Sequence, residues 1–273
     1  MLTGIEVEIG CTFEFATRRQ THAIVMVEPH FTEAGRLVES RFQIDPMSES
    51  TLYHDQFGNS CRRVDFAEGK VTLAFAATVE LSDEPDPEVW YAAEVPARDL
   101  PDEALLFLLP SRYCESDLLV GEAFERFGNV APGWGRVQAI SDWVHGAMHF
   151  QYGMSSPTYS ARNVFESRVG VCRDFTHLGI TMCRALNIPA RYVFGYLPDI
   201  GVPDPGSPMD FCAWMEVYLG DAWHTFDPRN NQRRVGRTVI GRGRDAADVA
   251  MVTTFGEVQL SSMDVVAEQA AQR

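Results

Sequence analysis

Cys172 is the residue of this chain whose surroundings best suit chemistry. It lies in the segment GVCRDF, residues 170–175, directly before apolar residues that recur at intervals of three and four: Phe175, Leu178, Gly179, Met182, Ala185 and Leu186. This spacing is typical of one buried helix face, so we expect Cys172 at or just before the first turn of a helix. Unpaired backbone N–H groups and the positive end of the helix dipole stabilise a thiolate there, which would make Cys172 a nucleophile. The alternative is a small buried core thiol, and this segment alone leaves both open.

His145 and His149 form a pair of candidate metal ligands. They lie in a segment where Val137, Ile140 and Val144 trace one helix face. Side chains at i and i+4 lie one above the other, so two such imidazoles could share a metal ion. The glutamate of an H-E-x-x-H motif is missing, and no third ligand is evident. We therefore interpret both histidines as structural or surface residues, and we assign no metal and no cofactor.

The composition of the 273 residues excludes some classes of function. The net charge is −15, which argues against a general nucleic-acid-binding protein. No apolar run approaches the length of a membrane span, and the first residues lack the basic and then apolar pattern of a signal peptide. The six cysteines include no CxxC pair. We therefore expect a cytoplasmic protein with reduced thiols that has no nucleic-acid or membrane partner.

Two regions of the chain differ in their pattern. Residues 5–81 alternate apolar and polar in short stretches between turns, which indicates an antiparallel β-sandwich. The acidic, proline-containing residues 82–87 mark a break. Beyond it the pattern predicts helices at 101–109, 115–127, 137–148, 160–167 and 172–187, and strands at 190–197, 210–219 and 222–227 with a two-residue turn at 220–221. We expect an α+β protein with an N-terminal β-sandwich domain at 1–84, a linker and first helix at 85–110, and a core domain at 111–273.

Four segments of the second region resemble the bacterial transglutaminase-like superfamily in type and order. They are GVCRDF (170–175), LNIPARYVFGY (186–196), DFCAWMEV (210–217) and WHTFDP (223–228). The resemblance is strongest over residues 134–231 and extends to the N-terminal β-region, which is similar to the sandwich that precedes the core in many members. It implies a papain-like core of helices packed on an antiparallel sheet, and a cysteine protease or amidase with a Cys-His-Asp triad.

The resemblance assigns a catalytic set residue by residue. It implies that Cys172 is the nucleophile and that Asp227 is the acid that orients the base. The usual sequence of the family at 210–214 is DFHAW, and position 212, where the histidine belongs, is Cys212. The catalytic set is therefore Cys172, Cys212 and Asp227, an incomplete triad. The oxyanion donors are left unassigned: the resemblance implies the Cys172 N–H as one candidate, and Tyr152 or Tyr159 is another.

Hairpin geometry offers no obvious substitute for the missing histidine unless a β-bulge shifts the register. A turn at 220–221 pairs Trp214 with Asp227, so Cys212 and these two residues share one face of the hairpin. His224 points to the other face, and His177 lies about 140° around the helix from Cys172. A catalytic base contributes ~10²–10⁴ in rate, so impaired amide turnover is expected.

The expected activity is hydrolysis of an amide bond in a peptide or protein substrate through a Cys172 thioester. Acyl transfer to an amine is less attractive, because nothing in the sequence points to an acceptor site. The alternative function is a catalytically inactive transglutaminase-like fold that binds a peptide or protein. In either case the expected substrate contacts are Trp214, Tyr152, Tyr159 and Arg229. Arg229 opens a run of six arginines without an acid at 229–244, which either forms internal ion pairs or binds substrate carboxylates. The oligomeric state is left unassigned.

Overall fold

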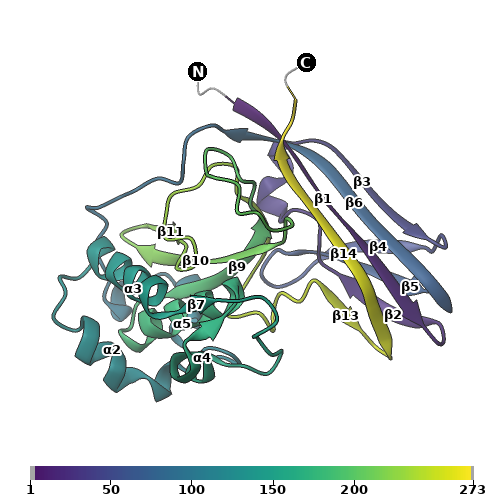
Figure 1. Ribbon diagram of the computed structural model, residues 1–273. Coiled ribbons are helices and arrows are strands. Elements are labelled where there is room, and N and C mark those ends of the chain that lie inside the picture. Colours follow the sequence, from purple (N-terminus) through teal and green to yellow (C-terminus); the bar gives the residue numbers. More distant parts are fainter. Residues whose placement is uncertain (1–3, 272–273) are drawn as a thin grey trace.

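The computed structural model describes residues 4–271 and shows a β-sandwich beside a core of helices and a third sheet (Figure 1). Each of the three larger sheets has four strands, and all of their pairings are antiparallel. This architecture confirms the expected α+β class. No helix among residues 4–271 is both long enough and apolar enough to cross a membrane.

The β-sandwich consists of one sheet in the order β14-β1-β6-β3 and a second in the order β13-β2-β5-β4. The first contains β1 (Gly4–Thr17), β3 (Leu37–Asp45), β6 (Gly69–Ser82) and β14 (Val258–Gln269). The second contains β2 (Thr21–Val25), β4 (Ser50–His54), β5 (Ser60–Phe66) and β13 (Val252–Thr254). Every second residue of β1 from Val7 to Phe15 is buried, because alternate side chains of a strand point to the same face. These residues belong to the main hydrophobic core.

The last two strands of the chain belong to the β-sandwich. β13 pairs with β2, and β14 pairs with β1 along most of its length, so the two ends of the described chain lie together (Figure 1). Sheet pairing thus places residues 252–254 and 258–269 with the N-terminal strands, although the sequence pattern grouped them with the core. We still propose that the chain folds as three units: a sandwich domain at 1–84, a linker with the first helix at 85–110, and a core domain at 111–273.

The core is built on a sheet in the order β11-β10-β9-β12. Its strands are β9 (Ala190–Tyr196), β10 (Cys212–Leu219), β11 (Ala222–Phe226) and β12 (Thr238–Gly243). The α-helices are α1 (Asp102–Leu105), α2 (Val120–Phe127), α3 (Trp134–Ala147), α4 (Ala161–Ser167) and α5 (Cys172–Ala185). The remaining elements are the 3₁₀ helices η1 (Phe31–Arg36), η2 (Ala97–Asp99), η3 (Leu106–Leu108) and η4 (Ser116–Leu118), and the parallel pair β7 (His149–Phe150) and β8 (Val169–Gly170).

α5 is the central helix of the core and is buried along almost its whole length. Gly179 lets it approach β10 closely, because a Cβ there would lie 3.0 Å from the Sδ of Met215. The helix begins at Cys172, as the sequence predicts. Its first turn is closed by the Asp174 carboxylate, which accepts a hydrogen bond of 2.9 Å from the Val171 N–H. Deep burial therefore holds the N-terminus of α5, and with it Cys172, at a fixed place beside the sheet.

β10 and β11 form the predicted hairpin. Leu219 pairs with Ala222 and Met215 with Phe226, which confirms the predicted register over these strands. Gly220 in the turn has a φ of 63°, in the left-handed region that favours glycine. Asp227 follows β11 directly, so the hairpin carries it to the end of the sheet where β10 begins at Cys212.

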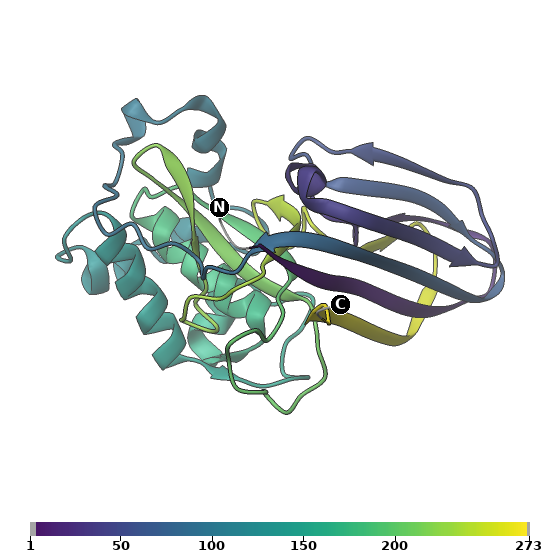
Figure 2. The ribbon, with the colours of Figure 1, turned by 90° about the horizontal axis from the view of Figure 1, so that it is seen from above.

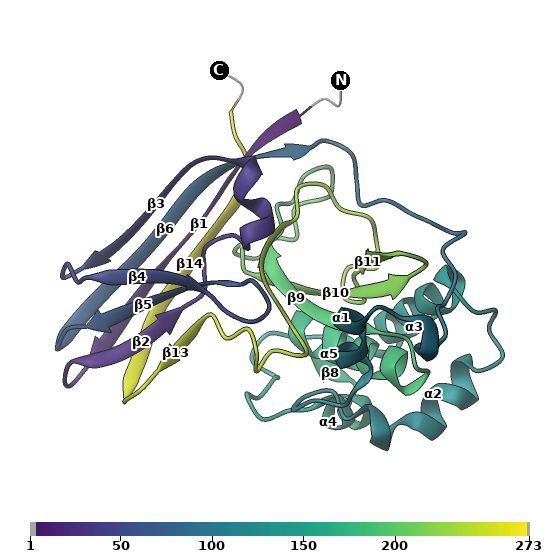
Figure 3. The ribbon, with the colours of Figure 1, turned by 180° about the vertical axis from the view of Figure 1, so that it is seen from behind.

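The β-sandwich and the core meet through ordered polar and aromatic contacts, and Figure 2 and Figure 3 show the two parts side by side from above and from behind. The Asn59 side chain donates to the Arg242 carbonyl (2.8 Å) and accepts from the Arg242 N–H (2.7 Å). The rings of Phe13 on β1 and Phe211 before β10 stack with centroids 6.2 Å apart. The sandwich is therefore packed against the segment that leads into the candidate site.

Candidate active site

The Cys172 thiol lies at the N-terminus of α5, beside the first residues of β10. Its Sγ is 3.9 Å from the Phe211 carbonyl oxygen, and the Cys212 Sγ is 3.7 Å from the Ala213 carbonyl oxygen. Both cysteines are partly exposed, and all six cysteines are free thiols. The structure thus brings together the two cysteines that are 40 positions apart in the printed sequence.

The two thiols have opposite pKa shifts. The largest effect on Cys172 is hydrogen bonding with the Cys212 thiol, which lowers the pKa of Cys172. The Ala213 backbone and the Arg229 charge lower it further, and together these effects outweigh burial, which raises it. The same hydrogen bond raises the pKa of Cys212 well above its ordinary value, as do burial and the nearby Asp227 carboxylate. Cys172 therefore ionises first, because it lies at the positive end of a helix while Cys212 faces a carboxylate. In the structure the Cys212 thiol is placed to donate to the Ala213 carbonyl, so it would turn toward Cys172 once that thiol is ionised.

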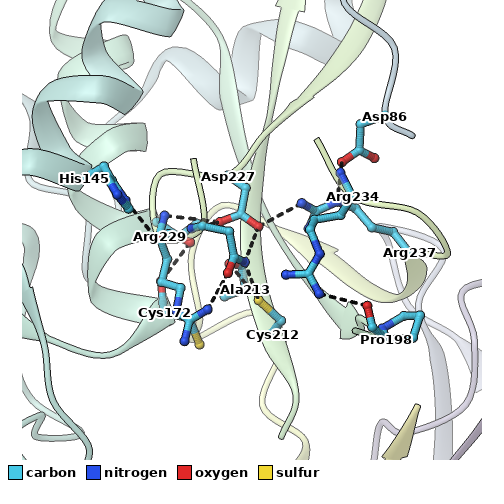
Figure 4. Close-up of polar contacts among 12 residues, drawn as sticks. Asp86, His145, Cys172, Pro198, Cys212, Ala213, Asp227, Arg229, Arg234 and Arg237 are labelled. Carbon is cyan, nitrogen blue, oxygen red and sulfur yellow. Dashed lines mark hydrogen bonds and ion pairs between the residues drawn. The ribbon is translucent and has the colours of Figure 1, made fainter. Parts of the chain in front are cut away.

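Asp227 is a buried carboxylate whose oxygens are held by groups of the protein. Oδ2 accepts from Arg237 Nη2 (2.8 Å) and from Asn230 Nδ2 (2.8 Å), while Oδ1 accepts from the backbone N–H of Asn230 (2.9 Å) and of Arg229 (3.2 Å). Burial alone would raise the pKa of the Asp227 carboxyl, but Arg237 and Asn230 hold it below its ordinary value. Figure 4 shows Cys212 and Arg237 approaching Asp227 from different sides. Asp227 is thus a permanent anion at neutral pH.

Asn230 connects Cys212 to Asp227, a role that the sequence pattern did not reveal. Its Nδ2 lies 3.8 Å from the Cys212 Sγ and donates to Asp227 at 2.8 Å. A cysteine side chain is shorter than a histidine, so the Asn230 amide supplies the N–H donor that an imidazole at position 212 would otherwise direct at Asp227. The signal in the sequence was only that Asn230 follows the FDP motif by two residues.

Asp210 is a second residue that the sequence analysis did not assign. It lines a cavity of about 140 Å³ together with Cys172, Cys212, Tyr152 and Arg229. We call this the polar cavity after these polar side chains, although most of its exposed lining is apolar. Burial raises the pKa of the Asp210 carboxyl, and the hydrogen bond from the Phe211 N–H to Oδ1 (2.7 Å) only partly offsets this effect. In the described chain no cation forms an ion pair with it. A carboxyl group with a raised pKa beside a nucleophile is a candidate proton donor.

The four expected substrate contacts have different surroundings. Tyr152 and Arg229 line the polar cavity with Cys172, and the Arg229 guanidinium lies 4.4 Å from the Phe150 ring centroid. Trp214 is 1% exposed, and the Arg237 guanidinium lies over its ring, with the Arg237 Cζ 4.8 Å from the ring centroid. Trp214 therefore supports the partner of Asp227 from below and does not line the cavity. Tyr159 lies in the loop before α4 and lines neither this cavity nor the apolar one on the other side of Cys172.

The histidines of the core lie away from Cys172. His224 packs against Trp134, with ring centroids 5.4 Å apart, on the face of the hairpin opposite to Cys212. His177 is fully buried, and its Nε2 accepts from the Ala246 N–H at 3.1 Å. Burial holds the pKa of His177 well below its ordinary value. His145 forms a 2.9 Å hydrogen bond with the Arg229 carbonyl. Within residues 4–271 no group of three or more His, Cys, Asp and Glu side chains could hold a metal ion.

Most of the arginine run forms internal ion pairs. Arg234 pairs with Asp199, Arg242 with Glu216, and Arg244 with Asp248, each with an N–O distance of 2.7–2.9 Å. Arg237 pairs with Asp227 and also with Asp86 (2.8 Å). These pairs favour the internal interpretation of the run for four of its six members. Arg229 is different, because its side chain reaches the polar cavity and pairs with the Asn230 side chain rather than with a carboxylate.

Comparisons with known proteins agree with this geometry. The sequence profile described as the transglutaminase-like superfamily matches residues 125–228. A solved structure of a “putative cysteine protease” from Cytophaga hutchinsonii superposes with a TM-score of 0.88 at 31% identity, over 99% of this chain and 92% of that one. An uncharacterised protein of Mycobacterium leprae is 24% identical over 97% of this chain and 95% of its own length. An uncharacterised protein of Mycobacterium tuberculosis is 39% identical over 113 residues, which are 37% of this chain and 35% of that protein.

Proposed function

Because the chain belongs to the transglutaminase-like superfamily, we propose that it is a cysteine-dependent hydrolase of amide bonds, with Cys172 as its nucleophile. The single observation that carries this proposal is the paired thiols at the N-terminus of α5, with Cys172 favoured as the anion. A thiolate at neutral pH is what amide attack requires of a cysteine. The other parts of the site support this role without an imidazole.

Acylation would proceed through a tetrahedral oxyanion, with the proton for the leaving amine supplied inside the site. The Cys172 thiolate attacks the carbonyl carbon of a peptide or protein substrate, and the C–N bond breaks to leave a thioester on Sγ. The leaving amine takes its proton from the Asp210 carboxyl, which burial keeps protonated to a higher pH than an ordinary aspartate. The Cys172 backbone N–H, in the first turn of α5, has no intrahelical acceptor and is oriented to stabilise the oxyanion.

Deacylation would reverse the role of Asp210. Its carboxylate takes a proton from a water molecule that attacks the thioester, the C–S bond breaks, and the Cys172 thiolate is restored. Asp227 contributes indirectly: it raises the pKa of Cys212 and so keeps that thiol protonated as a donor to Cys172. Arg229, which has no carboxylate partner among residues 4–271, would bind a carboxylate or carbonyl group of the substrate in the polar cavity.

The alternative function is a binding module without turnover, and one observation favours it. Protein donors occupy the Asp227 carboxylate at both oxygens, so Asp227 orients no base. In this alternative the same cavity binds a peptide or protein, and Cys172 undergoes no acylation. For both functions we propose a cytoplasmic protein, because the six free thiols suit a reducing compartment.

Hydrolysis of fluorogenic peptide amides tests the proposal, with Cys172→Ala as the inactive variant. Cys183→Ala is the matched control, because Cys183 lies in the same helix but is fully buried away from the site. We expect release of the fluorophore by the wild type and Cys183→Ala but not by Cys172→Ala. Saturable peptide binding without release, unchanged in Cys172→Ala, would instead support the binding module.

A further inference from the structure

A large apolar cavity lies between the β-sandwich and the core, on the other side of Cys172 from the polar cavity. Its volume is about 620 Å³, and Cys172, Asp210, Phe211 and Cys212 line it as well as the polar one. The thiol pair therefore lies where a small and a large cavity meet.

Both parts of the molecule supply the walls of this cavity, which we call the junction groove. Phe15 on β1 and Leu260 on β14 come from the sandwich, and Phe194 on β9 comes from the core sheet. Phe15 and Leu260 are paired residues of adjacent strands. Leu260 is 51% exposed and lies at the rim, whereas Phe15 is buried beneath it. The groove thus exists only because the C-terminal strand returns to the sandwich.

The lining of the junction groove fits an apolar group. Aromatic and aliphatic side chains make up most of it, and its cation, Arg173, is already engaged: its Nη2 donates to Ser155 Oγ (2.8 Å), to the Ser156 carbonyl (2.6 Å) and to Asp174 (3.1 Å). An anionic substrate group would lose its hydration there without gaining a free cationic partner. An apolar side chain would gain by leaving water.

We propose that the junction groove is the subsite for an apolar or aromatic side chain next to the carbonyl that Cys172 attacks, so that the β-sandwich sets the substrate preference of the enzyme. This inference rests on the proposed role of Cys172 as nucleophile. It names the substrate class: peptides or proteins with a large apolar residue at the acyl side of the reacting bond. A glycine at that position would leave the groove empty, and an acidic residue would place its carboxylate beside Phe15 and Leu260.

Alkylation of Cys172 tests the groove without requiring turnover. The probes are the chloromethyl ketones of N-acetyl-phenylalanine and N-acetyl-glycine, which carry the same reactive group and hold the side chain on the acyl side of the carbonyl, and the modified cysteine is located by peptide mass spectrometry. We expect the phenylalanine reagent to react about tenfold faster at low concentration, the ratio that corresponds to about 1.4 kcal/mol of apolar transfer. Its rate should also saturate with concentration, because binding precedes reaction.

Two surface variants of β14 make the assay specific. Leu260→Asp introduces a carboxylate at the rim of the groove, and Val266→Asp introduces the same charge on the same strand but outside the groove. Leu260 is 51% exposed and Val266 is 45% exposed, so neither variant disturbs the buried core. The rate ratio should fall to about one in Leu260→Asp and stay unchanged in Val266→Asp. Equal rates for both reagents in the wild type, or equal loss in both variants, would overturn the groove while leaving the nucleophile intact. Failure of both reagents to modify Cys172 at all would overturn the proposed function itself.

Discussion

Removal of the Cys212 thiol should raise the pKa of Cys172. In the proposed site the Cys212 S–H donates to the Cys172 thiolate, and this is the largest single effect that lowers the pKa of Cys172. A hydrogen bond to a charged group contributes about 1.5–3 kcal/mol, and a thiol is a weak donor, so the lower end applies. At about 1.4 kcal/mol per pKa unit, the variant Cys212→Ala should raise the pKa of Cys172 by about one unit.

The assay is the rate of iodoacetamide alkylation of Cys172 as a function of pH. The midpoint of the pH–rate curve is the readout, because a thiolate of higher pKa is also a better nucleophile and partly masks the change at a single pH. Cys212→Ser is the matched control: it keeps a hydroxyl donor at the same position and should retain most of the lowered pKa. In the wild type the midpoint should lie below the ordinary cysteine value of about 8.5.

One result would refute this reasoning directly. If Cys212→Ala, shown to be folded, has the same midpoint as the wild type, then the helix terminus alone sets the pKa of Cys172 and the paired thiols have no electrostatic role. A midpoint near the ordinary cysteine value in the wild type would remove the thiolate, and with it the nucleophile assignment.

Three further predictions follow from the same site. Asp210→Asn should slow hydrolysis of a peptide anilide by about 10²-fold or more but leave the first-turnover release of p-nitrophenol from a p-nitrophenyl ester unaffected, since only an amine leaving group needs a proton during acylation; in the wild type the anilide rate should fall as pH rises through the raised pKa of Asp210. Cys212→His should raise the rate of anilide hydrolysis, and the double variant with Asn230→Ala should raise it further, because the Asn230 amide otherwise occupies the Asp227 oxygen that an imidazole needs. A double variant no faster than Cys212→His alone would contradict this. Arg237→Ala should lower the free energy of unfolding by about 3–5 kcal/mol in urea titrations, since it leaves two carboxylates without their buried partner, whereas the exposed Arg233→Ala should change it by less than about 0.5 kcal/mol. Because the pKa of Asp227 is lowered in the folded protein, this stabilisation is present above the unfolded pKa of about 3.9 and is lost as pH falls through the folded value.

The local features of the fold and site follow from the sequence because they depend on short-range patterns. The spacing of apolar residues predicts that a helix starts at Cys172. The two-residue turn predicts how β10 and β11 pair over residues 215–226. The return of β14 to β1 depends on pairing between residues some 250 positions apart, which a periodic pattern does not specify.

The roles of Asn230 and Asp210 were not predicted, and for Arg237 the arginine run indicated an internal ion pair but not its partners, for a related reason. The contacts of Asn230 and Arg237 with Asp227 are set by the loop after β11, which has no periodicity from which to place side chains. The raised pKa of Asp210 comes from burial by surrounding segments rather than from its own neighbours in the chain. A substitution such as Cys212 for histidine is visible in the sequence, but the groups that compensate for it become visible only in three dimensions.

The central claim, that Cys172 forms a thioester, is tested most directly by trapping the acyl-enzyme. The protein is mixed with p-nitrophenyl acetate, whose leaving group needs no proton, quenched in acid within the first turnover and digested for peptide mass spectrometry. The account predicts an acetyl group on the peptide that contains Cys172, and none on this peptide in Cys172→Ala. Absence of the acetyl group from a folded wild-type protein, or its presence only on Cys212 or another residue, would contradict the claim.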